Sequence, residues 1–78
     1  MSISKKIKIM MVLGEKDHAA LAECFGISKQ ALSNKFYRES FSAEELIKAA
    51  QFCGCELVAT SPTGNIVKFD SNDIRSES

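Results

Sequence analysis

DHAALAECFGISKQALSNKF, residues 17–36, reads as two short helices, about 18–25 and 29–37, joined by a tight turn at 26–28. Asp17 precedes the first helix and is a natural N-cap, because its carboxylate can accept hydrogen bonds from free backbone N–H groups. The glycine that opens the turn can adopt a left-handed conformation without strain and so redirects the chain. Ser28 can cap the second helix in the same way. Two capped helices around so short a turn are typical of a helix-turn-helix motif.

The side chains of this segment separate into two faces. The apolar ones fall where the two helices must pack on each other and on a body: Ala22, Phe25, Ile27, Leu32 and Phe36. The polar ones of the second helix share the opposite face near its beginning: Lys29, Gln30, Ser33 and Asn34. Glutamine and asparagine can pair bidentately with adenine, and lysine favours guanine, so this face suits reading of the DNA major groove.

A helix is predicted before the motif. Ser2 or Ser4 can cap it, and an apolar stripe at helical spacing begins at Ile3 and Ile7. Gly14 is expected to end it in the left-handed region. Three lysines, Lys5, Lys6 and Lys8, lie on the other side of this helix, and the sequence leaves open whether they form a solvated face or contact a DNA backbone.

After the motif, Ser42 and Glu45 form the pattern of a capping box at the start of a fourth helix that runs to about Phe52. The apolar period then changes from about 3.6 to 2, and turn residues at 62–65 separate two β-forming runs. We therefore predict a β-hairpin at 55–70 and a flexible tail at 71–78.

The expected fold is mostly α: a four-helix domain with a helix-turn-helix motif and a C-terminal β-hairpin. Of the 78 residues, we expect 1–70 to form a single domain, with the motif itself at 17–37. An isolated two-stranded hairpin is weak in water, so the hairpin should pack on the helices or pair with the strands of another copy.

The formal net charge is zero, which is unusual for a nucleic-acid binder because phosphate neutralisation supplies much of the affinity. The charges are nevertheless unevenly distributed. Residues 1–38 contain seven lysines and arginines against three acidic residues, and residues 39–78 contain three against seven. The basic half carries the candidate reading helix, as expected for a molecule with one anion-facing side.

The three cysteines, Cys24, Cys53 and Cys55, are odd in number and no secretory leader is recognisable, so free thiols in a cytoplasmic protein are expected. The sequence lacks the paired CxxC-type spacing that is typical of the cysteine ligands of zinc, which argues against a metal site. No stretch approaches the length of a membrane span. Neither a nucleophile with a recognisable setting nor a phosphate-binding glycine loop is present, so we expect no enzyme, no catalytic residues and no cofactor.

The chain resembles the lambda-repressor/Cro-like (Xre-type) helix-turn-helix family of phage and bacterial regulators. The resemblance rests on LAECFGISKQALSNKF and extends through FSAEELIKAAQFCGCEL, and it covers about residues 3–57. It implies a sequence-specific regulator of transcription of the phage or mobile-element repressor type. Such proteins bind double-stranded DNA, usually as homodimers on near-palindromic operators, and here the hairpin could build the dimer.

Carried over onto this sequence, the resemblance implies a set of residues that read bases: Lys29, Gln30, Ser33 and Asn34. The residues expected to contact the DNA backbone are His18, Ser28, Lys35 and Arg38. His18 stands where many family members carry a glutamine that holds a phosphate. The neutral net charge leaves a second reading, in which an accessory or anti-repressor protein keeps the fold as a protein-interaction module without binding DNA.

Overall fold

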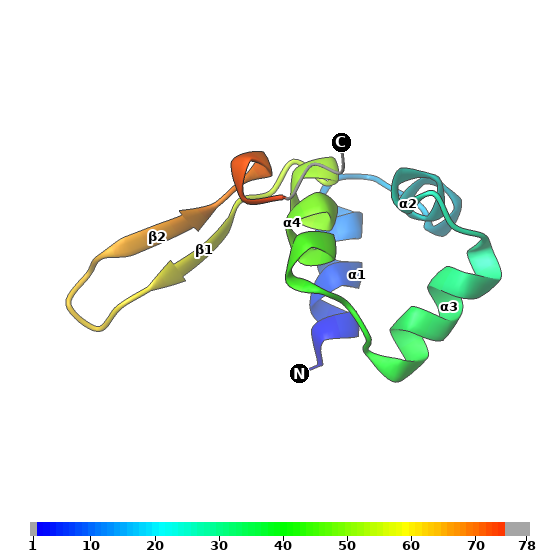
Figure 1. Cartoon of the computed structure of the whole chain (residues 1–78), viewed down its shortest axis with the longest axis horizontal. Coiled ribbons are helices and arrows are strands. Elements are labelled where there is room, and N and C mark those ends of the chain that lie inside the picture. Colours follow the sequence, from blue (N-terminus) through cyan, green and yellow to red (C-terminus); the bar gives the residue numbers. More distant parts are fainter. Residues whose placement is uncertain (1, 75–78) are drawn as a thin grey trace.

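The computed structural model describes residues 2–74, which form four helices, a hairpin and a short 3-10 turn. The helices are α1 (Ile3–Leu13), α2 (His18–Phe25), α3 (Lys29–Arg38) and α4 (Ala43–Phe52). The strands are β1 (Leu57–Thr60) and β2 (Ile66–Phe69), and the turn η1 (Ser71–Asp73) follows. Figure 1 shows α1 and α4 side by side, with α2 and α3 on one side of them and the hairpin on the other. The predicted mostly-α architecture, four helices followed by a C-terminal β-hairpin, is confirmed.

Each helix begins where its predicted cap lies. The hydroxyl oxygens of Ser2, Ser28 and Ser42 accept hydrogen bonds from backbone N–H groups in the first turns of α1, α3 and α4, and the Asp17 carboxylate does the same for α2. Ser42 and Glu45 form the complete reciprocal capping box. Local chemistry thus fixes the starts of all four helices.

The core joins all four helices. Its largest fully buried side chains are Ile7 of α1, Leu21 of α2 and Leu32 of α3. Ala22 is only 2% exposed, so a larger residue there would push its neighbours apart. The motif therefore packs as the sequence predicts.

Two details of α1 differ from expectation. Ile3, which was expected in the apolar stripe, is exposed, and Ser4 is buried instead. The buried Ser4 hydroxyl is satisfied because it donates to the backbone oxygen of Phe36 at 2.6 Å. Gly14 is not left-handed: its φ is −90°, and Glu15 adopts the positive φ of 55°. Glycine is required because a Cβ at position 14 would collide with the backbone of Cys53.

The hairpin extends away from the helices as an arm (Figure 1). The strands are antiparallel, with Leu57 opposite Phe69 and Thr60 opposite Ile66, and together they form a two-stranded sheet. The turn η1 occupies the beginning of the segment for which a flexible tail was predicted; residues 75–78 of that segment lie outside the described residues. Among residues 2–74 no helix is both long and apolar enough to span a membrane.

Candidate DNA-binding interface

One exposed face of α3, which we call the reading face, carries the four side chains predicted to read bases. Lys29, Gln30, Ser33 and Asn34 are all exposed, whereas Leu32 and Phe36 on the opposite side are buried. The amide groups of Gln30 and Asn34 lie together, with Gln30 Nε2 donating to Asn34 Oδ1 at 3.4 Å. The structure thus places hydrogen-bond donors and acceptors together between Lys29 and Asn34 of α3. The opposite side of the helix is fixed by its packing against the core.

His18, the first residue of α2, is tied to α3. Its Nε2 lies 3.0 Å from the backbone oxygen of Lys29 and 3.2 Å from Ser33 Oγ. A carbonyl oxygen only accepts hydrogen bonds, so Nε2 carries the proton and donates to it. The contact occupies Nε2 and leaves Nδ1 as the ring nitrogen that could face another molecule.

The His18 ring also lies at the edge of an open depression of about 430 Å³ between α1, α2 and α3. Lys8 reaches it from α1, with its ammonium 5.2 Å from the centre of the Phe36 ring. Tyr37 of α3 lines it too and is 90% exposed. Cationic and hydroxyl groups thus gather beside the reading face.

The residues predicted from the sequence to contact DNA did not include Tyr37. For Lys8, the sequence left open whether it is solvated or contacts a DNA backbone. The signal for Tyr37 was available, because it stands four residues after Ser33 and so lies on the same side of the helix. The contribution of Lys8 depends on the packing of α1 against α3, which no local pattern in the sequence reveals.

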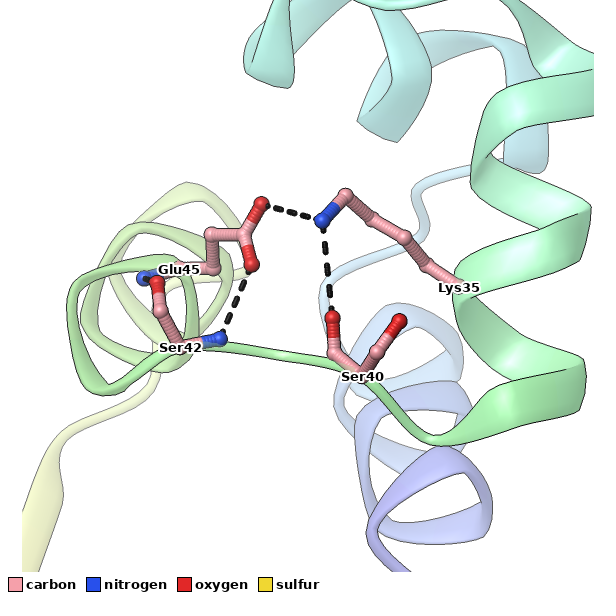
Figure 2. Close-up of polar contacts among 4 residues, drawn as sticks. All are labelled: Lys35, Ser40, Ser42 and Glu45. Carbon is pink, nitrogen blue, oxygen red and sulfur yellow. Dashed lines mark hydrogen bonds and ion pairs between the residues drawn. The ribbon is translucent and has the colours of Figure 1, made fainter.

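Lys35 lies apart from the reading face. Its ammonium forms an ion pair with Glu45 Oε2 of α4 at 2.8 Å and donates to the backbone oxygen of Ser40 at 3.4 Å (Figure 2). Partial burial raises the pKa of Glu45, but the hydrogen bonds from Lys35 and Ser42 and the charge of Lys35 outweigh it, and the net pKa lies below its ordinary value. In this arrangement Lys35 connects the end of α3 to α4.

The other two residues expected at the DNA backbone lie at opposite ends of α3. Ser28 caps the start of the helix by accepting from the Ala31 N–H at 3.0 Å, and its own hydroxyl proton remains available for donation. Arg38 is the last residue of α3 and is exposed. The structure therefore does not gather the four expected backbone contacts into one cluster.

The thiols do not form a metal site within the described part of the chain. Cys24, Cys53 and Cys55 are free, and residues 2–74 contain no group of three or more histidine, cysteine or acidic side chains placed to hold a metal ion. Cys53 is buried, and this burial raises the pKa of its thiol, so it is a poor nucleophile.

A comparison with protein-family models matches residues 7–60 to the bacteriophage CI repressor helix-turn-helix domain. The match begins inside α1, includes the whole motif and α4, and ends at the last residue of β1. Searches of curated proteins and of solved structures find no match. The matched family is a class of DNA-binding repressor domains and not a class of enzymes. Since more than half of the chain matches, and the caps, the core and the left-handed Gly26 of the motif are all in place, the chain belongs to the bacteriophage CI repressor helix-turn-helix family.

Proposed function

We propose that this protein is a sequence-specific transcriptional repressor of the phage or mobile-element type, which inserts α3 into the major groove of double-stranded DNA and acts as a homodimer in the cytoplasm. The observation that carries the proposal is the reading face of α3, defined as Lys29, Gln30, Ser33 and Asn34. These four side chains are exposed on a helix whose other side is buried. A helix that is packed on one side and carries hydrogen-bonding side chains near its beginning is suited to contacting base edges.

The backbone of the DNA would be held from the two ends of the reading face. His18 and Ser28 stand at the start of the motif's helices, and Arg38 stands at the end of α3. Lys8 and Tyr37 add groups beside His18. Lys35 was expected to contact a phosphate as well; while it is paired with Glu45 its role is to orient α3, and a phosphate contact would require that ion pair to open.

The decisive experiment is in-vitro selection of binding sites with the purified full chain. We expect a selected half-site, and we expect Gln30→Ala and Asn34→Ala each to relax base preference, by about 1–3 kcal/mol for each lost bidentate contact. The matched control is Gln51→Ala, which removes the same kind of exposed side chain from α4. Sites identical for the wild type and both α3 variants would refute the base-reading assignment.

Salt dependence separates base reading from backbone contact. Arg38→Ala should weaken binding to all sequences alike and reduce the slope of log affinity against log salt by about one. Lys48→Ala, which removes an exposed charge from α4, should leave the slope unchanged. Weak binding to every sequence, together with tight binding to a protein partner, would favour the accessory-protein reading and overturn the proposal.

A further inference from the structure

The two faces of the hairpin differ in chemistry. Residues directly opposite in an antiparallel pair share a face, and so do residues two apart on one strand. The register therefore places four apolar side chains, and nothing else, along one face of the two strands: Leu57, Ala59, Val67 and Phe69. We call this the apolar face. The other face is mixed and carries the 2.9 Å ion pair between Lys68 and Glu56.

The apolar face is open to solvent along most of its length. Val67 is 57% exposed and Phe69 39% exposed, and Ala59 is exposed as well, whereas Leu57 at the base is half-buried. The arm extends from the helices instead of folding back on them (Figure 1). A two-stranded sheet with an uncovered apolar face is only marginally stable in water, so we expect another surface to cover this face.

We infer that the occupant is the apolar face of a second copy of this chain, packed face to face about a two-fold axis. The inference rests on the proposed function, because that function requires a second reading helix. One helix alone covers too few base pairs for useful specificity. The charges around the hairpin are compatible with a self-contact, because the apolar face carries no ionisable group and the ion pair between Glu56 and Lys68 stays on the outer side.

The shapes of the side chains favour packing between faces over pairing between strand edges. Joining edges alone would leave the apolar face of both copies in water, whereas stacking the faces removes it. Small Ala59 lies opposite Val67 in the middle of the face, between the larger pair at the base and the polar turn. This leaves space in which Val67 of the second copy can lie.

The contact is small. Four residues at about 3.4 Å per residue, on two strands about 4.8 Å apart, give a footprint of roughly 14 by 10 Å. That is well below a standard protein interface, so the dimer should be weak in free solution and become populated on DNA with two half-sites.

Sedimentation of the full chain at high micromolar concentration tests the surface without DNA. We expect Val67→Glu to raise the dimer dissociation constant more than tenfold, because two carboxylates meet across the axis. Val67→Lys should do the same, and an equimolar mixture of the two variants should form a mixed dimer. The mixed dimer requires both variants to be folded and the two positions to meet, so it excludes loss of folding as the cause.

Ile66→Glu is the matched control. Ile66 is the adjacent residue, is 67% exposed and lies on the mixed face, so its substitution should leave the dimer intact. The inference is overturned by a wild type that stays monomeric with and without two-site DNA, or by equal disruption from Ile66→Glu and Val67→Glu. It is also overturned if substitution of Val12 and Leu13, the exposed apolar residues of α1, breaks the dimer while Val67→Glu does not.

DNA with a single half-site keeps this inference distinguishable from the proposed function. Wild type and Val67→Glu should bind one half-site equally, and only the wild type should gain at least tenfold when a second half-site is added. Specific single-site binding without that gain would refute the hairpin contact alone. A stable dimer without sequence preference would refute the DNA-reading proposal alone.

Discussion

The helical body and the hairpin arm obey different physical rules. In the body, Leu21 and Leu32 are fully buried, and one polar side chain, Ser4, is buried with them and hydrogen-bonded. In the arm, every residue of β2 is exposed, and the ion pair between Glu56 and Lys68 lies in solvent. The body is therefore specified by its own core, whereas the arm has a regular backbone without a core of its own. A change of one methyl group should matter in the body and hardly at all in the isolated arm.

The largest effect should come from truncating the body. Leu32→Ala removes a side chain with no exposed surface and leaves a cavity, so the free energy of unfolding should fall by about 2–5 kcal/mol. Val67→Ala in the arm should change it by less than about 0.5 kcal/mol at concentrations where the chain is monomeric. Urea unfolding followed by helical circular dichroism measures both, and equal losses would contradict the distinction between body and arm.

Gly14→Ala should come next, at about 1–3 kcal/mol. The backbone of Cys53 occupies the place that the new methyl group would take, so α1 and α4 must separate. Gly64→Ala is the comparison in the arm: a Cβ there meets no atom within 4 Å, although its φ of 91° strains any residue other than glycine. Thermal unfolding of both variants should show the greater loss of stability for Gly14→Ala. A smaller loss for Gly14→Ala would mean that α1 and α4 can move apart at little cost in free energy.

Ser4→Ala should cost about 1 kcal/mol, since it leaves the Phe36 carbonyl without the hydroxyl that donates to it. Because that bond joins α1 to the end of α3, the variant should also weaken DNA binding. Ser2→Ala, which removes the α1 cap without touching α3, should reduce stability but not affinity at a temperature where both variants are folded. Equal affinity of Ser4→Ala and wild type would show that α3 is held by the core alone.

The smallest effect concerns Glu45. Glu45→Gln keeps the capping box, because glutamine also accepts from the Ser42 N–H, and it loses the ion pair with Lys35. The pair is partly exposed, so the loss at neutral pH should be below about 1 kcal/mol. The folded-state pKa of Glu45 is lowered, so its contribution is present above the ordinary value of 4.5 and disappears as pH falls through the lower folded pKa. Unfolding curves of wild type and Glu45→Gln should therefore converge in acid; a difference that persists there would show that the ion pair is not its source.

The body was largely predictable because its signals are local. Ser28, Ser42 and Gly26 each act within three or four residues of their place in the sequence, and all three do in the structure what their chemistry predicts. The hairpin likewise follows from turn residues between two β-forming runs, although its register did not form part of the prediction.

What escaped prediction depends on contacts between distant segments. Ser4 and Phe36 are 32 residues apart, and Cys53, whose backbone demands glycine at position 14, lies directly after α4. The ion pair of Lys35 was missed for the same reason: a lysine at the end of a basic helix looks free until α4 places Glu45 beside it. The reading face could be named from its spacing, but the use of each side chain there is set by tertiary packing.

The hydrogen bond between His18 and the Lys29 carbonyl has a consequence for the shape of the DNA that the protein accepts. It links the first residues of α2 and α3 directly, so in the proposed complex a phosphate held at His18 and a base edge met by α3 would stand at a fixed separation. A groove that is wider or narrower than this separation can satisfy one contact only by straining the other. Selection then extends to the deformability of base pairs that no side chain touches. In the proposed complex the motif would therefore discriminate between grooves of different width as well as between bases.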